Sequence, residues 1–148
     1  MSMIEKTSLS CLALLLGLLG GLAQADVVLV ADPSLALDAL TPEQARRLYL
    51  AQPGRFPGGQ RLVPFDQPPS SPARRVFVRE VLKKSERELA QYWSRRTFAG
   101  KGRPPRVLPD DAAVIEQVMR SPGSLGYIDA DSLDDRVKVL LRIPDTAP

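Results

Sequence analysis

The N-terminal segment limits how much of this chain is available to fold. Residues 9–22 form a run of 14 mostly apolar residues, and the Ala23-Gln24-Ala25 that follows has the small-x-small pattern of a signal-peptide cleavage site. We expect residues 1–25 to be a signal peptide that is removed after Ala25. Residues 26–148 then comprise 123 residues, which is the size of one domain with one hydrophobic core.

The same segment has two alternative interpretations, a membrane anchor and a lipoprotein signal. The apolar run is short for a bilayer core of about 30 Å. Most of the run follows Cys11, whereas the cysteine of a lipoprotein signal comes after the run. We therefore expect an exported protein, periplasmic in a Gram-negative host, with no membrane segment after cleavage.

The histidine and cysteine content excludes the most familiar catalytic and metal sites. The chain has no histidine, and its single cysteine, Cys11, lies in the expected signal peptide. Ser-His-Asp triads, Cys-His pairs, ordinary zinc sites and disulfide frameworks need residues that the rest of the chain lacks. Composition therefore favours a binding protein that is not an enzyme and uses no metal or cofactor. Asp66 is a candidate for acid–base catalysis, but no motif places a second residue with it.

Positive charge is concentrated in the middle of the chain. Residues 74–106 carry 11 basic and 3 acidic side chains, whereas residues 107–148 carry 4 basic and 8 acidic ones. The middle third is either an anion-binding surface or a pair of amphipathic helices with solvated, Arg-rich faces. Nucleic acid is not an expected partner, because basic and aromatic residues are not interleaved as they are in single-strand binders.

Segments typical of strands alternate with segments typical of helices. Apolar or alternating runs predict strands at 27–31, 61–65, 125–128 and 137–143. Pro64 indicates that the second strand ends there or lies at the edge of a sheet. Helices are expected to follow the N-capping residues Thr41, Ser71, Ser85 and either Asp110 or Asp111. The pattern predicts an α/β fold with a small mixed sheet flanked by helices.

The helical segments carry apolar residues at a spacing of three and four, which predicts their buried faces. These residues are Ala73, Val76, Phe77, Val81 and Leu82, then Leu89, Tyr92 and Trp93, and then Val114, Ile115, Val118 and Met119.

Four sequence blocks occur in an order that is typical of one protein family. Residues 92–105 read YWSRRTFAGKGRPP, which resembles a W…F-x-G-x-G-x-x-P block, and residues 122–128 read PGSLGYI, which resembles P-G-x-[IL]-G-Y-[IV]. LTPEQ at 40–44 and the VPF and RVF segments that follow match the same order. Over nearly all of residues 27–143 the chain resembles small phosphate ABC transporter substrate-binding proteins.

The resemblance implies one lobe of a type II periplasmic-binding-protein-like fold, over residues 26–148. Full members of the family have two lobes and close them around the oxyanion, and they are about twice as long. A chain of one lobe would hold its ligand on an open face.

The resemblance also implies a ligand site. Family phosphate sites use a hydroxyl-rich turn at a helix N-terminus, where free N–H groups and the helix dipole favour an anion. The matching turn here offers Ser70, Ser71 and Arg74, and Ser34 matches a second hydroxyl-bearing loop. Asp66 stands where the family has an arginine. Its carboxylate would repel a dianion, but it would accept a hydrogen bond from a protonated phosphate.

This turn departs from the family in further ways. The family's Ser-Gly-Thr triplet is absent, and Pro72 has no N–H to donate. The alternative interpretation is that Ser71 is only an N-cap and Arg74 is solvated. The neighbouring Arg75 points about 100° away around the helix, so it is not expected to share the site.

Two other groups of residues have a structural and a functional interpretation. Tyr92, Trp93 and Phe98 are either core residues at helical spacing or the lining of a pocket. The acidic run from Asp129 to Asp135 is either a solvated turn or a calcium loop, although it lacks the glycine and terminal glutamate of an EF-hand. Gly123 and Gly126 are expected to serve backbone geometry at a turn and at a strand start.

The leading hypothesis is an exported, non-enzymatic binding protein for phosphate or a related small oxyanion, linked to phosphate uptake and to a membrane permease. The alternative is a periplasmic interaction module that binds no ligand and contacts another envelope protein. Both hypotheses use the same fold and differ in whether Ser70, Ser71, Arg74, Asp66 and Ser34 hold an anion.

Overall fold

The computed structural model describes residues 26–53 and 56–148, so the predicted signal peptide 1–25 lies outside the described residues. In that part of the chain the strands are β1 (Val27–Ala31), β2 (Val63–Asp66), β3 (Arg106–Val107), β4 (Ser124–Asp129) and β5 (Lys138–Ile143). The α-helices are α1 (Pro42–Tyr49), α2 (Pro72–Phe77), α3 (Glu86–Phe98) and α4 (Asp111–Arg120). Shorter helical segments are η1 (Pro57–Gly59), the π-helical turn η2 (Val78–Leu82) and η3 (Ala130–Ser132).

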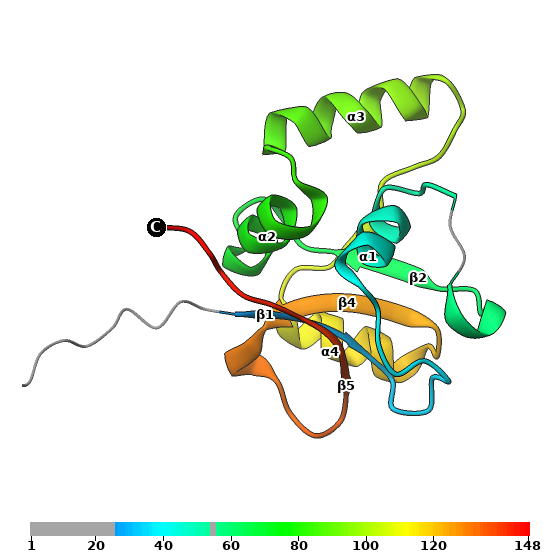
Figure 1. Cartoon of the computed structure of the whole chain (residues 1–148), viewed down its shortest axis with the longest axis vertical. Helices are drawn as coiled ribbons and strands as arrows, with labels where there is room; N and C mark the ends of the chain where they lie inside the picture. The colour runs from blue at the N-terminus through cyan, green and yellow to red at the C-terminus, as the bar shows by residue number, and fades with distance from the viewer. Residues whose placement is uncertain (1–25, 54–55) are drawn as a thin grey trace, which may run out of the picture.

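The strands form a sheet in the order β3-β2-β4-β1-β5 (Figure 1). Strand β1 is antiparallel to its neighbours β4 and β5, whereas β2 is parallel to β3 and β4. The predicted α/β class and the mixed sheet are therefore confirmed. Only the two-residue β3 was missed, because both of its residues are exposed and carry no apolar pattern.

Strand β1 has a buried side chain at every position, as its continuous apolar run predicts. Its side chains alternate between the two faces of the sheet. Leu29 packs in a core formed with α1, α2, η2 and α3, and Val28 and Val30 pack in a second core formed with α4. Helices therefore cover both faces of the sheet, and β1 belongs to both cores (Figure 1).

The prediction that the strand ends at Pro64 is wrong, whereas the alternative of an edge position holds for Pro64 itself but not for the whole strand. Strand β2 continues to Asp66 and lies between β3 and β4. Pro64 pairs with Leu125 of β4, but β3 pairs only with Phe65 and Asp66. Because β3 is so short, Pro64 has a neighbouring strand on one side only, which a residue without an N–H tolerates.

The predicted helix starts are confirmed at all four positions. Thr41 and Ser85 form complete capping boxes with Gln44 and Glu88. The Ser71 hydroxyl accepts from the N–H of Arg74, and the Asp110 carboxylate accepts from the N–H of Ala113. Local hydrogen bonding therefore fixes where each helix begins, independently of long-range packing.

Helix α3 projects from the body of the protein (Figure 1), and Leu89 is its one fully buried residue. Tyr92 and Trp93 pack half-buried against the first core. Phe98, at the end of the helix, is 96% exposed, so of its two interpretations the one as a core residue is wrong. Met119 of α4 is 40% exposed, so its predicted place on the buried face of that helix is also wrong. Both residues lie at the end of a helix, beyond the part that packs against the core.

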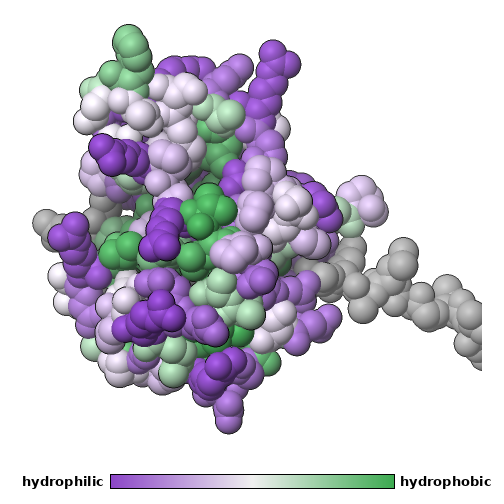
Figure 2. Space-filling model, turned by 180° about the vertical axis from the view of Figure 1, so that it is seen from behind, coloured by the Kyte–Doolittle hydropathy of each residue, from purple (hydrophilic) through white to green (hydrophobic). Residues whose placement is uncertain are grey.

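Surface composition differs between parts of the molecule. Seen from behind, hydrophobic side chains gather at mid-height, with hydrophilic ones above and below them (Figure 2). Within residues 26–53 and 56–148, no helix is both long and apolar enough to cross a bilayer.

We expect Thr41→Ala to lower the free energy of unfolding by about 1 kcal/mol, because it removes the acceptor for the N–H of Gln44. Chemical denaturation of the purified protein measures this change. Ser94→Ala on the exposed face of α3 is the control and should change stability by less than about 0.5 kcal/mol. Equal effects of the two variants would contradict a capping role for Thr41.

Candidate functional site

The predicted anion-binding turn follows β2, and the strands that come next in the sequence lie on opposite sides of β2. After β2 the chain passes to β3 on one side and then, through α4, to β4 on the other. Helices α2 and α4 begin at the carboxyl ends of the parallel strands β2 and β3. In open α/β sheets, ligands bind outside the carboxyl ends of strands at such a switch point.

Arg74 is held by carboxylates on two sides. Its Nε and Nη2 atoms donate to the two carboxylate oxygens of Glu86, over 2.7 and 2.8 Å. Its Nη1 atom donates to Asp66 Oδ2 over 2.8 Å and to the carbonyl oxygen of Gln67 over 2.9 Å. The side chain of Arg74 is only 10% exposed. Arg74 is therefore neither solvated nor open to a ligand in this structure.

Asp66 joins the end of β2 to β4 and α2. Its second carboxylate oxygen accepts from the Tyr127 hydroxyl and from the N–H of Gln67. Burial raises the pKa of Tyr127 above its ordinary range, and the charge of Asp66 adds to the shift. The hydroxyl of Tyr127 is therefore a donor to Asp66 at any physiological pH. Asp66 is close to Arg74, as the site prediction requires, but both of its oxygens are occupied.

The two serines of the turn differ in their availability. The Ser71 hydroxyl donates to Gln67 Oε1 over 2.8 Å while it caps α2. Ser70 is exposed, and its hydroxyl has no hydrogen bond to another described residue. Of the predicted donors, Ser70 is thus the one that is available without rearrangement.

Ser34 lies away from this cluster. Ser34 follows the carboxyl end of β1, which lies beside Leu125 at the start of β4. Asp66 is the last residue of β2, which runs parallel to β4 and therefore ends near the other end of β4. The Ser34 hydroxyl and N–H both bond to Asp32, which lowers the pKa of Asp32. The structure therefore brings Asp66, Ser70, Ser71 and Arg74 together and leaves Ser34 at the other end of the sheet.

A groove of about 510 Å³ opens beside the turn, between the starts of α2 and α4. Gln67 and Ser71 line one side, and the opposite side carries the carboxylates of Asp110, Asp111 and Asp129. Asp111 accepts from Gln67, from Ser132 and from the N–H of Asp129, so it joins β2, α4 and β4. The acidic wall of this groove disfavours a free anion.

The residues after β4 fit the solvated-turn interpretation of the acidic run. Asp129 accepts from the N–H of Asp131 and caps η3, and Asp134 pairs with Arg136. The carboxylates of Asp129 and Asp134 thus bond to neighbours in the same turn.

Sequence reasoning missed three members of the Arg74 cluster: Glu86, Gln67 and Tyr127. Glu86 is the first residue of α3 and lies next to a capping box, which gave it a local role only. Gln67 is nearly fully buried and contacts β2, α2, α4 and β4 at once. A glutamine directly after a strand could have suggested a buried side chain that links several elements. The partners of Gln67 could not be predicted, because Asp111 and Tyr127 are distant in sequence.

Searches against family models and against curated proteins found no match. Similar solved structures do exist. An ABC-type phosphate transport receptor from Vibrio cholerae matches 78% of this chain and 46% of its own length, with a TM-score of 0.62 and 21% identity. The fold of this chain therefore matches one region of a periplasmic-binding-protein fold.

Two further structures give the same result. PstS from Borrelia burgdorferi matches 79% of this chain with a TM-score of 0.57 and 16% identity. A Clostridium perfringens chain assigned as a phosphate ABC transporter substrate-binding protein, crystallised with bound phosphate, matches 78% with a TM-score of 0.61 and 16% identity. The chain spans 45–47% of the length of these three proteins. The match therefore covers one lobe's worth of the fold, as predicted.

Proposed function

We propose that this protein is an exported, non-enzymatic binding protein for phosphate or a related small oxyanion, acting in the periplasm with a membrane permease. The observation that carries the proposal is the position of Arg74 and Ser70 at the switch point of a fold shared with phosphate-transport receptors. Ser70 and Ser71 would donate hydroxyls, Arg74 would supply charge, and Asp66 would accept from a protonated oxyanion.

Binding at Arg74 requires Glu86 to leave. Of the two carboxylates on Arg74, Asp66 is 13% exposed and fixed by Tyr127, whereas the Glu86 side chain is 44% exposed. Glu86 presents two oxygens to Nε and Nη2 in the bidentate manner that an oxyanion would adopt. Glu86 thus occupies the ligand's place, and an oxyanion must compete with it.

Titration with inorganic phosphate tests the proposal, followed by Trp93 fluorescence and by melting temperature. Trp93 lies on α3, two turns after Glu86, so displacement of Glu86 should alter its surroundings. We expect a saturable response of the wild type at millimolar phosphate. Glu86→Gln should bind about tenfold more tightly, because it removes the competing charge. Glu116→Gln on the exposed face of α4 is the matched control and should bind like the wild type.

A second candidate function is an interaction module that binds no small ligand. The observation that favours it is that Arg74, Asp66 and Ser71 already satisfy one another and their neighbours. If neither the wild type nor Glu86→Gln responds to millimolar phosphate, oxyanion binding at Arg74 is refuted. A stoichiometric envelope protein recovered by cross-linking would then support the second candidate.

A further inference from the structure

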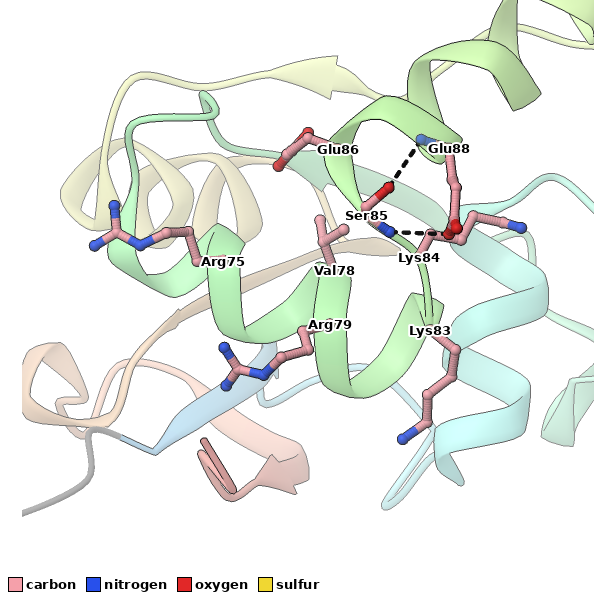
Figure 3. A pocket seen from close by; sticks show the side chains of 8 residues that line it. All are labelled: Arg75, Val78, Arg79, Lys83, Lys84, Ser85, Glu86 and Glu88. Carbon is pink, nitrogen blue, oxygen red and sulfur yellow. Dashed lines mark hydrogen bonds between the residues drawn. The ribbon is translucent and has the colours of Figure 1, made fainter. Parts of the chain in front are cut away.

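A second cavity lies on the other side of α2, away from the turn. It measures about 590 Å³ and lies between α2 with η2 and the beginning of α3 (Figure 3). We call this cavity the basic groove, because four of its eight lining residues are basic and two are acidic; the lining is Arg75, Val78, Arg79, Lys83, Lys84, Ser85, Glu86 and Glu88. Glu86 also pairs with Arg74, so the groove adjoins the proposed oxyanion site, but Arg74 itself does not line it.

The cations of the basic groove come from α2, from η2 and from the turn that follows η2. Arg75, Arg79 and Lys83 follow one another at intervals of four residues along α2 and η2. Arg75 and Arg79 extend to the same side, whereas Lys83 and Lys84 extend in other directions (Figure 3). Because the charges do not converge on one point, a small ion would contact only one or two of them. An extended ligand with several negative charges would contact more.

Two of these cations have no partner in the structure. Among the described residues, no hydrogen bond or ion pair reaches the side chain of Arg75 or Lys83, and both residues are exposed. Arg79, between them, pairs with Glu80 and Asp145. Lys84 lies over the ring of Tyr92 at 5.3 Å. The groove therefore offers two positive charges without an ion pair, on either side of a paired one and beside the carboxylates of Glu86 and Glu88.

One cation of the groove, Arg79, already binds a carboxylate from another part of the chain. Asp145 belongs to the segment after β5, 66 residues from Arg79 in sequence, and its carboxylate accepts from Arg79. In the same segment Thr146 donates to Glu80 over 2.8 Å. A carboxylate on an extended segment is thus already bound at the middle cation.

The backbone at Lys83 supports a role for its charge. Lys83 has a φ of 56°, in the left-handed region that glycine adopts without strain, where it ends η2. A lysine here costs stability relative to glycine. The position nevertheless carries a positive charge at the mouth of the groove.

We propose that the basic groove docks an extended acidic segment of a partner protein, whose carboxylates pair with Arg75 and Lys83 on either side of the Arg79–Asp145 pair. A concave site between two helices admits a polypeptide segment, whereas a flat bilayer would reach only its rim. No aromatic side chain lines the groove to stack on bases. These features favour an acidic polypeptide over a lipid surface or a nucleic acid.

The test uses fluorescence anisotropy of a labelled peptide of alternating glutamate and serine, with the glutamine–serine peptide as reference. We expect the purified protein to bind the glutamate peptide, with affinity that falls between about 50 and about 300 mM salt. The double variant Arg75→Ala, Lys83→Gly should weaken binding by about tenfold or more. Lys83→Gly relieves the left-handed backbone, so loss of binding cannot be ascribed to a weakened fold.

The matched control is Arg61→Ala, Arg120→Ala, Ala51→Gly. It removes two exposed positive charges elsewhere and relieves the other left-handed non-glycine residue, Ala51, whose φ is 51°. Retained binding by this variant supports the groove. Equal loss in both variants would mean that only net charge matters, and it would overturn the proposal. So would equal binding of the two peptides, or groove-dependent binding to phosphatidylglycerol vesicles without peptide binding. The phosphate response should be the same in the groove variant and the wild type, which keeps the two proposals separable.

Discussion

Replacing Arg74 by methionine should lower the free energy of unfolding by about 3–5 kcal/mol, the cost of leaving buried charge without its partner. Methionine matches the length of the arginine stem but offers no donor. Asp66 would keep the Tyr127 hydroxyl and lose its cation, and the Gln67 carbonyl would lose a donor. Glu86 contributes less to the loss, because water reaches it.

Arg75→Met provides a matched control for this experiment. Arg75 is the next residue on the same helix, is exposed and has no ionic partner among the described residues. Its replacement should change stability by less than about 0.5 kcal/mol. Urea denaturation of both variants decides the outcome. Similar small effects at both positions would show that the Arg74 cluster does not stabilise the fold.

The pH dependence of stability gives a second measurement on the same variant. The hydrogen bonds from Arg74, and then its charge, lower the pKa of Glu86 below its ordinary value of 4.5. A lowered folded-state pKa stabilises the fold above the unfolded value, and this contribution is lost as pH falls through the folded value. The wild type should therefore lose stability below about pH 4.5. Arg74→Met should lose less in that range, because Glu86 then has no cation.

The local half of the candidate site was predictable from sequence. Ser71 is an N-cap and Pro72 opens α2, because both preferences depend on residues within one turn. The same locality explains why the oxyanion interpretation of Arg74 missed its partner. Glu86 lies 12 residues away, beyond η2, and reaches Arg74 only because the chain reverses at Lys83. Side-chain pairs formed across such a reversal leave no periodic signal.

For the fold, too, local features were predictable from the sequence and long-range ones were not. The strand β1 was recognised because a run of five apolar residues can be buried on both faces of a sheet. The sequence did not show where the buried face of a helix ends, because Phe98 and Met119 continue the apolar pattern but are exposed. A helical period predicts which side of a helix is apolar, but it does not predict how far the neighbouring element extends along that side. The antiparallel placement of β1 between β4 and β5 also depends on long-range pairing.

The pairing of Arg74 with Glu86 sets a condition that oxyanion binding must meet. The structural relatives are about twice as long as the matched region. In this chain the residues at the carboxyl end of β2 are largely buried, and Arg74 is only 10% exposed. Glu86 occupies the Nε and Nη2 donors of Arg74, so any oxyanion that binds there must first displace it.

The close approach of β4 to α4 predicts the other large effect. Gly126 was expected to serve backbone geometry, but its importance is steric, because a Cβ there would lie 2.3 Å from Val114 Cγ1. Carbon atoms in contact are about 3.5–4.0 Å apart, so α4 must move away from the sheet. We expect Gly126→Ala to lower the free energy of unfolding by about 3 kcal/mol, at the upper end for overpacking.

A double-mutant cycle with Val114→Ala tests the steric cause. Val114→Ala alone should cost about 2 kcal/mol, because it leaves a cavity in the α4 core. In the double variant the truncated side chain makes room for the new methyl group, so the combined loss should fall short of additivity by about 2 kcal/mol. Gly100→Ala separates the backbone effect, since Gly100 has a φ of 68° and open space around it. That variant should cost about 1 kcal/mol, and Val114→Ala should not relieve it. Additive losses at Gly126 and Val114 would show that the two residues do not compete for the same space.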